Sequence, residues 1–455
     1  MSFALFLLLA TALVMFSFGV LRIRKILTLP VVVAYLYLAF FVPQALHLER
    51  DVYGPWLNAD FLFLYMTAAL IALALGFYVT SSGLLGGPAE QRRKTTAFER
   101  WRLPGNVSAP MNKYEQKLLA GAIVLWLIGA VANYQLSATD TSELGNMWTG
   151  VATLWFLLGQ STFFSLAIAA LLYARTGRKV YLIIGLLTLS AVLIGFGGNV
   201  KRHMIAETLI ILGGSIFFVF NWRPPRVAVF AICFLGMVLL HQVGDVRAYI
   251  QRGEGTVVSA FVEGVPFERF SYFQADDAPE LSIAALDIHY AREQDVAEGP
   301  VELWNDLVLR YVPAFALGRD FKDSLMMEHE LAQEGMDYEM YATPGITHTG
   351  FSDTFRSFSY FGVLVFGLIG MLFGWLWKHA LAGAFWAQFY YLILLNDALV
   401  AFTQSSARFL SGLPFILAVT LPFIWRFGQK VYHTRQARRR AHETADRPPA
   451  TGRPA

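Results

Sequence analysis

Eleven apolar runs dominate this chain of 455 residues. Each run is close to the ~20 mainly apolar residues that a helix needs to cross a bilayer. The runs are 3–21, 27–46, 60–80, 117–136, 150–173, 180–197, 204–220, 227–243, 358–377, 382–401 and 409–426. Hydrophobic residues form 56% of the chain, which excludes an ordinary soluble domain. The sequence therefore predicts an all-α polytopic membrane protein with eleven transmembrane helices.

The basic residues predict the orientation of these helices, because short cytoplasmic loops are enriched in Lys and Arg. One set of loops, together with the tail, holds 24 of the 36 basic residues. We therefore expect the C-terminus in the cytoplasm and, with an odd number of spans, the N-terminus outside. The first twenty residues lack a basic segment and a cleavage site, so we interpret them as a retained span rather than a signal peptide.

The runs divide the chain into four predicted parts. Residues 1–243 hold eight helices, 244–357 form one large outer (periplasmic) loop, and 358–428 hold three more helices. Residues 429–455 form a basic cytoplasmic tail whose polar, Pro-rich composition predicts disorder. Cys233 is the only cysteine, which excludes a disulfide within the chain and a cysteine-based metal site.

The outer loop is strongly acidic. It has 21 Asp and Glu residues against eight Lys and Arg residues, a formal charge of −13, which is not the surface of a nucleic-acid-binding protein. Seven of the eight basic residues are arginines, and Arg310 is one of them. The planar fork of arginine suits bidentate contact with phosphate or carboxylate. For any single arginine, the simpler interpretation is an ion pair with one of the surplus acids.

Two short helices are predicted within this loop. Residues 301–315 form the first, and its aromatic, amphipathic face suits a membrane interface. Five apolar residues share that face: Val301, Trp304, Leu307, Val308 and Tyr311. Residues 319–335 form the second helix, with Asp320 or Asp323 as its cap and Gly335 as its stop.

The turn at 198–203 joins two spans on the predicted outer side. Lys201 and Arg202 are the main exception to the charge pattern among the short loops. His203 and Glu207 lie four residues apart, hence on one face of the next helix. An ionisable residue just inside an apolar helix usually faces a polar cavity or a partner. The alternatives are an ion pair of Glu207 with His203 or Lys201, and simple anchoring of the two cations to lipid phosphates.

Residues 341–374 run from the outer loop directly into the ninth span. His348, Asp353 and Arg356 arrive at the membrane surface together, and Arg408 precedes the last span on the same side. Small residues at helical spacing then permit close helix packing. These are Gly362, Gly367, Gly370 and Gly374.

Three features together resemble the bacterial oligosaccharide repeat-unit polymerases, the O-antigen polymerase (Wzy-type) class. The chain is polytopic, with one dominant outer loop late in the sequence. A Gly-x-x-Lys/Arg-type turn, here Gly198 to Arg202, lies between two mid-chain helices. The late loop returns through a Gly/Ser-rich aromatic segment into a YFGxxxFG pattern, here Tyr360 to Gly367. The resemblance implies a GT-C-like bundle in the bacterial inner membrane.

The resemblance also implies glycosyl transfer at the periplasmic face, for O-antigen or exopolysaccharide synthesis. The donor would be a polyprenyl-pyrophosphate-linked oligosaccharide and the acceptor a sugar hydroxyl on another lipid-linked unit. The leaving group needs fixed cations at headgroup depth, and the acceptor hydroxyl needs a general base. The candidate bases are His348, Asp353 and Glu207, and the candidate substrate-binding residues are Lys201, Arg202, His203, Arg310, Arg356 and Arg408.

No cofactor is expected, because no metal-ligand cluster is evident in the sequence and cationic side chains would replace a metal. The other expected partners are the lipid bilayer and a chain-length regulator protein. No phosphate loop, GxSxG elbow or HExxH motif is present to suggest a soluble-enzyme chemistry.

Other functions remain open. An O-antigen ligase or another lipid-linked glycosyltransferase fits the same architecture, but the ligase histidine is usually followed by asparagine, whereas Thr349 follows His348 here. A transporter or flippase for a lipid-linked saccharide typically has internal repeats and charges deep in several helices. No such repeat is found, and the charges gather at one face. A structural subunit of a polysaccharide export assembly is the remaining alternative.

Overall fold

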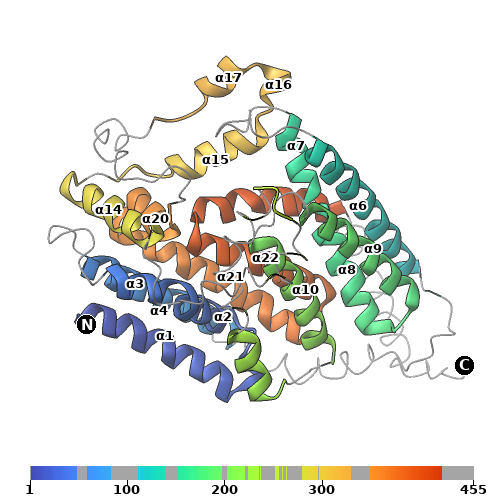
Figure 1. Cartoon of the computed structure of the whole chain (residues 1–455), viewed down its shortest axis with the longest axis horizontal. Coiled ribbons are helices and arrows are strands. Elements are labelled where there is room, and N and C mark those ends of the chain that lie inside the picture. Colours follow the sequence, from blue (N-terminus) through green and yellow to red (C-terminus); the bar gives the residue numbers. More distant parts are fainter. Residues whose placement is uncertain are drawn as a thin grey trace, which may run out of the picture. The chain divides into compact units, whose positions relative to one another are not determined.

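The computed structural model describes residues 2–48, 59–82, 113–138, 151–196, 202–220, 224–234, 279–295, 297–328 and 348–422, with a few isolated positions between them. These stretches form helices and turns, and they contain no strand (Figure 1). The chain divides into two compact units, Met1–Ser411 and Gly412–Ala455. In the second unit, the described residues 412–422 are helical.

The helices of the first unit appear in chain order along the colour scale of Figure 1. They are α1 (Phe3–Leu21), η1 (Ile23–Lys25), α2 (Leu29–Leu36), η2 (Tyr37–Phe41), α3 (Val42–Leu48), α4 (Ala59–Ser81), α6 (Lys113–Ala138), α7 (Val151–Gly159), α8 (Ser161–Thr176), α9 (Lys179–Phe196), α10 (Arg202–Phe220), α14 (Pro279–Glu293), α15 (Val301–Tyr311), α16 (Ala314–Leu317), α17 (Arg319–Ser324), α20 (Gly350–Phe358), η3 (Ser359–Gly362), α21 (Val363–Leu381) and α22 (Phe385–Thr403).

Seven helical segments in the described stretches are long and apolar enough to cross a membrane, so the protein is an all-α polytopic membrane protein. They are Phe3–Leu21, Leu29–Leu48, Ala59–Ser81, Glu115–Leu136, Val151–Thr176, Gly350–Leu381 and Phe385–Thr403. Three shorter apolar helices coincide with other predicted runs: Lys179–Ala191, Met204–Phe220 and Ser406–Pro422. The predicted run 227–243 is described only in part. The predicted class is confirmed, and the count of eleven spans stays a prediction.

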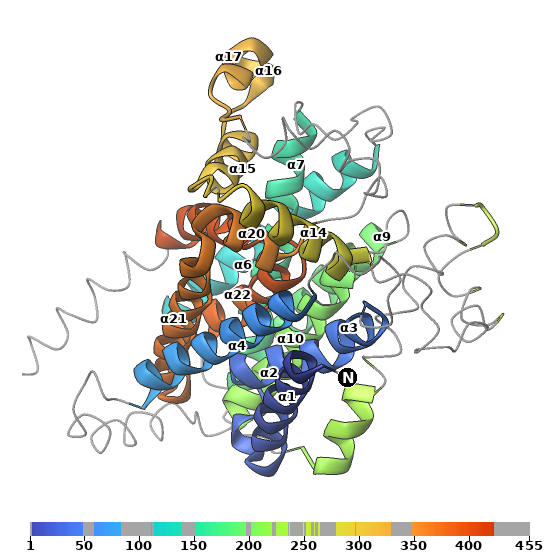
Figure 2. The ribbon, with the colours of Figure 1, turned by 90° about the vertical axis from the view of Figure 1, so that its left-hand side faces the viewer.

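Glycines let α4 and α21 pack with their backbones in contact (Figure 2). A Cβ atom built on Gly370 would lie 2.1 Å from the carbonyl oxygen of Leu73, and one on Gly374 would lie 2.2 Å from that of Phe77. Neither space admits a larger residue. The predicted role of these two glycines in close helix packing is therefore confirmed.

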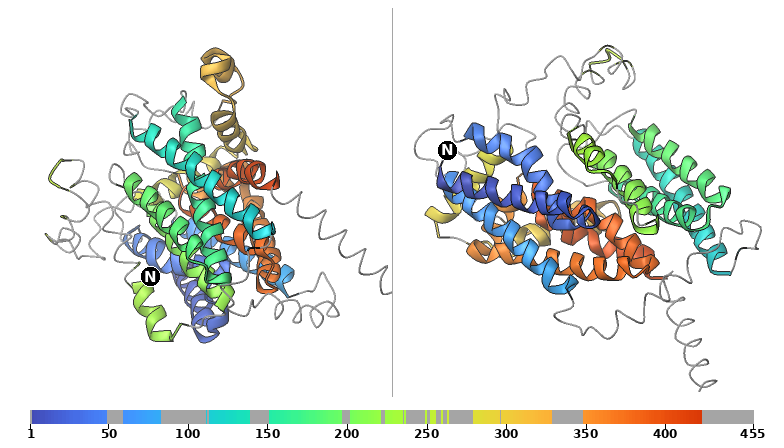
Figure 3. Two further views of the ribbon diagram at one scale, coloured as in Figure 1. Left: turned by 90° about the vertical axis from the view of Figure 1, so that its right-hand side faces the viewer. Right: turned by 90° about the horizontal axis from the view of Figure 1, so that it is seen from below.

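Helices α6, α8 and α9 pack against one another (Figure 3). Hydroxyl groups of α8 join it to α6: Ser161 donates to the carbonyl oxygen of Leu125 at 3.0 Å, and Ser165 donates to that of Ala122 at 2.8 Å. Helix α10 contacts both α8 and α22, and so connects this group to the rest of the unit.

The short helix α20 lies against α22, α14 and α15 (Figure 2). Its first residue is Gly350, where a Cβ atom would lie 1.7 Å from the carbonyl oxygen of Ala401, so only glycine allows this approach to α22. Phe351 is buried and packs its ring against Tyr37 and Phe402. This packing fixes the segment that carries His348 close to the end of α22.

The first predicted loop helix is confirmed as α15, which ends before Pro313. Of the five apolar residues on the predicted face, Val301 and Val308 are buried, whereas Trp304 and Tyr311 are exposed. The predicted contact of this face with a membrane interface stays a prediction.

The second predicted loop helix, 319–335, is wrong in length. Helix α17 ends at Ser324, and its N-cap position is Gly318 rather than either predicted aspartate. The chain leaves the helix because it turns back toward α15, where the carbonyl oxygen of Leu325 accepts a hydrogen bond from the Trp304 ring nitrogen at 2.7 Å. The predicted stop, Gly335, lies outside the described residues.

Candidate functional site

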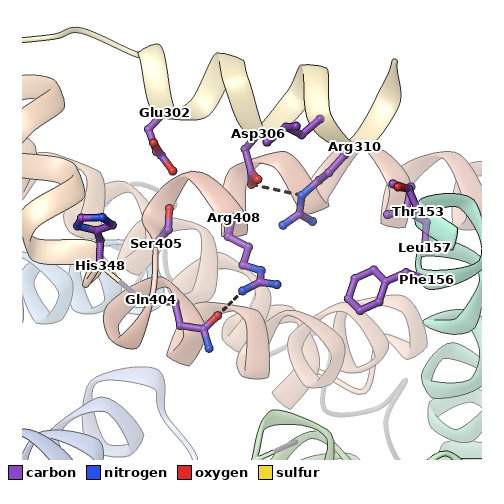
Figure 4. A pocket seen from close by; sticks show the side chains of 11 residues that line it. Thr153, Phe156, Leu157, Glu302, Asp306, Arg310, His348, Gln404, Ser405 and Arg408 are labelled. Atoms are coloured by element: carbon purple, nitrogen blue, oxygen red, sulfur yellow. Dashed lines mark hydrogen bonds and ion pairs between the residues drawn. The ribbon is translucent and has the colours of Figure 1, made fainter. Parts of the chain in front are cut away.

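A cavity of about 290 Å³ lies between α15, the first turns of α7 and the chain that follows α22 (Figure 4). Three predicted site residues from distant parts of the sequence line it together: Arg310, His348 and Arg408. The other lining residues are Thr153, Phe156, Leu157, Glu302, Asp306, Leu309, Gln404 and Ser405. The structure thus brings a candidate base and two candidate cations into one space.

Helix α15 directs polar groups into this cavity through its periodicity. Glu302, Asp306 and Arg310 are spaced four residues apart, so their side chains project from one face. The helix is held in place by Asn305, whose side chain donates to the carbonyl oxygen of Met327 and accepts from its backbone N–H, both at 2.9 Å.

His348 contacts Asp287 of α14, with 2.8 Å between Nδ1 of the histidine and Oδ2 of the aspartate. The Asp287 side chain is 3% exposed and that of His348 is 50% exposed. With Nδ1 engaged by the carboxylate, Nε2 is the ring nitrogen that can exchange a proton with a ligand. A histidine held in this way by a buried carboxylate has the arrangement of a general base.

The environment of His348 raises the pKa of its imidazole above the ordinary value of 6.5. The largest cause is the hydrogen bond that the ring donates to Asp287, which stabilises the charged ring. Burial and the charge of Arg356 act in the opposite direction, while the charges of Asp287 and Glu302 add to the increase. The pH above which the ring is mostly neutral, and able to accept a proton, is therefore higher than the ordinary histidine pKa of 6.5.

Two guanidinium groups share the other part of the cavity. Arg310 forms an ion pair with Asp306 at 3.3 Å, and Arg408 donates to the side-chain oxygen of Gln404 (Figure 4). Asp306 also accepts a hydrogen bond from the Ser411 hydroxyl at 2.7 Å. Arg310 and Arg408 lie close enough for their like charges to repel each other. An anion placed between them would relieve that repulsion and accept hydrogen bonds from both.

Asp353 does not line the cavity with His348. One oxygen of its carboxylate, Oδ2, accepts four hydrogen bonds at the start of the helix Ser406–Pro422. The donors are the hydroxyl groups of Ser405 and Ser406 and the backbone N–H groups of Ser406 and Ala407, at 2.7–3.1 Å. Asp353 therefore caps this helix from α20 and has a positioning role, while its predicted role as a base stays a prediction.

Arg356 is likewise engaged by the protein itself. Its side chain pairs with Glu298 at 3.0 Å, and the Glu298 side chain is 3% exposed. The backbone N–H groups of Glu298 and Gly299 donate to the carbonyl oxygens of Arg356 and Ser357. This is the simpler interpretation for a loop arginine: the pair fastens the chain before α15 to α20.

Glu207 lies apart from His348, on α10, within electrostatic range of Asp397 on α22. Asp397 in turn interacts with the charges of both Arg310 and Arg408. Glu207 is thus connected to the cationic part of the cavity through Asp397, and it does not line the cavity. Lys201 lies outside the described residues, as do the side chains of Arg202 and His203, so their predicted roles stay predictions.

Sequence reasoning missed the groups that complete the site. Asp287 is a single acid among the buried apolar residues of α14, and that pattern was the signal that could have identified it. Glu302 and Asp306 could have been found from their spacing with Arg310. Gln404 and Ser405 carry no such signal, because short polar residues between spans are common.

The fold and the cavity define a polytopic membrane protein with a polar site near the ends of its spans. No protein-family model matches the chain, and it has no match among curated proteins or solved structures. In the described stretches, no three His, Cys, Asp or Glu side chains are grouped so as to hold a metal ion.

Proposed function

We propose that this protein is an inner-membrane glycosyltransferase that polymerises polyprenyl-pyrophosphate-linked oligosaccharide units at the periplasmic face. The observation that carries the proposal is the meeting, in one cavity, of the Asp287–His348 pair with Arg310 and Arg408. A glycosyl transfer from a lipid pyrophosphate needs both functions: a base for the acceptor and fixed positive charge for the leaving group.

The cavity residues match the steps of this reaction. Nε2 of His348 takes the proton of an acceptor hydroxyl while the hydroxyl oxygen forms a bond to the anomeric carbon of the donor. The bond between that carbon and the phosphate oxygen breaks, and its electron pair leaves with the lipid pyrophosphate. Arg310 and Arg408 stabilise the charge that develops there. Asp287 stabilises the imidazolium, and Glu302, Gln404 and Ser405 offer hydrogen bonds to sugar hydroxyls.

The composition of the cavity wall supports a substrate that is part sugar and part lipid. Glu302, His348 and Ser405 lie at one end of the view in Figure 4, and Phe156 and Leu157 lie at the other, with Arg310 and Arg408 between them. A sugar, a phosphate and an apolar chain occur in the same order in a lipid-linked saccharide.

The proposal is tested with the purified protein in vesicles and a polyprenyl-pyrophosphate-linked oligosaccharide as the substrate. The wild-type chain is expected to make longer lipid-linked saccharides, separated by gel electrophoresis. His348→Ala should lower the rate by about 10²–10⁴-fold, the usual contribution of a general base.

The matched control is His289→Ala. His289 is a second histidine of the outer region; it pairs with Glu293 on α14 and does not line the cavity. Its replacement should leave the rate within about twofold, because surface pairs contribute little. Equal rates for wild type and His348→Ala would contradict the proposal. Transfer only to a different acceptor, without chain growth, would favour the ligase alternative.

A further inference from the structure

Six large apolar side chains between residues 304 and 327 face solvent, although this segment lies outside the spanning helices. They are 37–55% exposed and come from α15, α16, α17 and the turn that follows: Trp304, Tyr311, Phe315, Leu317, Phe321 and Met327. We call this set the α15–α17 apolar surface. Several exposed apolar side chains within one short segment mark an interaction site more often than a single exposed one does.

This exposure is particular to one part of the outer region. Helix α14 belongs to the same predicted loop, yet none of its large apolar side chains is exposed. Leu281, Leu286 and Ile288 of α14 are each at most 5% exposed. The acidic loop can therefore bury its apolar groups, and the α15–α17 apolar surface needs its own explanation.

The two helices at either end of the surface are amphipathic. On α17, Arg319 and Asp323 form an ion pair at 3.5 Å along one side, and Phe321 projects from the opposite side at 100° per residue. On α15, the cavity residues Glu302 and Asp306 occupy one face, and Trp304 projects away from it. A polar face opposite an aromatic one is the pattern of a helix that lies in a membrane interface.

Hydrogen bonds fold the segment into one unit and fasten it to the start of the shorter apolar helix Ser406–Pro422. Lys322 donates to the carbonyl oxygen of Leu309 at 2.8 Å, which joins α17 to α15. The Tyr311 hydroxyl donates to the carbonyl oxygen of Ser411 at 2.7 Å, and Ser411 lies in the first turns of the apolar helix Ser406–Pro422. The apolar surface is therefore attached to the first turns of an apolar helix.

The neighbouring helix α7 begins a segment that is long and apolar enough to span a membrane. It shares the cavity wall with α15, and its residues Val151 and Leu154 are exposed within a spanning segment, where the surroundings are lipid. The bilayer is thus the apolar phase next to the surface. Tyr and Trp are the residues that favour the boundary between headgroups and hydrocarbon.

We propose that the α15–α17 apolar surface rests on the lipid bilayer, with Phe315, Leu317 and Phe321 inserted among the headgroups. The segment then acts as an interfacial anchor that holds α15, and with it one wall of the cavity, at a fixed depth. The inference does not depend on the glycosyltransferase activity, because it uses only exposure, amphipathicity and attachment to an apolar helix.

The test measures lipid contact at single positions of the full-length protein. Cys233→Ser removes the native thiol, and Phe321→Cys or Asp323→Cys then introduces one spin label on either side of α17. The proteins are placed in vesicles of phosphatidylcholine and phosphatidylglycerol. Collision rates of the label are measured with oxygen, which concentrates in lipid, and with a water-soluble nickel chelate.

The ratio of the collision rate with oxygen to the collision rate with the chelate should be severalfold higher for the label at 321 than for the label at 323. Leu317→Cys provides a second position with the same expected result if Phe321→Cys changes the elution profile of the protein. Equal collision ratios at 321 and 323 would show that the surface faces water. Exclusion of both reagents at 321 would show that protein covers it, from a partner or a second copy. Either of these results overturns the proposal.

Discussion

Two histidines of the predicted outer loop differ in the carboxylate that each one contacts. His289 pairs with Glu293 one helical turn away, and the Glu293 side chain is mostly exposed. His348 lies in the chain before α20 and contacts Asp287 of α14, which is almost fully buried. A buried carboxylate cannot turn away into water, so it fixes the orientation of the His348 ring as well as its tautomer. At the residue scale, this difference separates a surface contact from a candidate catalytic pair.

Asp287→Asn should change the pH dependence of activity as well as its rate. The base acts in its neutral form, and Asp287 raises the pKa of His348, so the wild-type rate should increase as pH rises through that raised pKa. Asparagine removes the negative charge, which lowers the pKa of His348 toward its ordinary value. The acid limb of the pH–rate profile should therefore move to lower pH, while the maximal rate falls because the imidazolium loses its stabilising charge.

The measurement is the initial rate of saccharide transfer between pH 5 and 9, with His289→Ala as the control for a changed charge environment near α14. A purely structural role for Asp287 would lower the rate at every pH and leave the midpoint of the acid limb in place. That result would remove Asp287 and His348 from the proton-transfer step.

The candidate site was predictable from the sequence only where a residue's role depends on its neighbours in the chain. His348 and Arg408 stood out because they precede apolar runs, and Arg310 because arginine is nearly the only basic residue type in the acidic loop. Their partners were not predictable, because Asp287 and His348 are 61 residues apart and no local pattern records that contact. The same limit explains Asp353 and Arg356, which are held by Ser406 and Glu298 across the fold.

At the element scale, the helix Ser406–Pro422 depends on a cap that comes from another helix. Asp353 of α20 receives the hydrogen bonds that the first turn of this helix offers, and Arg408 belongs to that turn. The cap therefore fixes where one of the cavity cations lies. Spans were easier to predict than short helices. An apolar run in the sequence defines a span, whereas the end of α17 depends on contacts with α15 that the local sequence does not record.

Asp353→Asn and Asp353→Ala should separate the capping role from catalysis. Asparagine keeps an oxygen acceptor and is as good a cap as aspartate, so Asp353→Asn should retain most activity. Alanine leaves buried donors unsatisfied and should lower the free energy of unfolding by about 1–3 kcal/mol. Unfolding temperature and transfer rate, measured on the same preparations, provide the check. An inactive but fully stable Asp353→Asn protein would restore Asp353 as the candidate base.

At the scale of the whole molecule, the spanning helices separate two polar ends. Helix α22 begins beside Arg175, which donates to Gln388 at 2.6 Å and to the carbonyl oxygen of Gly383 at 3.1 Å, and it ends at Gln404 in the cavity wall. The segment Val151–Thr176 runs the other way, from Thr153 at the cavity to Arg175. The cavity and the Arg175 contacts therefore lie at opposite ends of these two spans, and the cavity can be periplasmic only if the Arg175 end is cytoplasmic.

The charge distribution of the sequence predicts that arrangement, and thiol labelling of intact cells tests it. In a Cys233→Ser chain, Lys179→Cys places one thiol just beyond the Arg175 end, and Ala297→Cys places one beside Glu298, at the cavity end; both positions are exposed. A membrane-impermeant maleimide should label the Ala297→Cys protein in intact cells whose outer membrane has been permeabilised. It should label the Lys179→Cys protein only after the inner membrane is opened. The reverse pattern would place the cavity in the cytoplasm, where a periplasmic polymerase could not work, and would contradict the proposed function while leaving the fold unchanged.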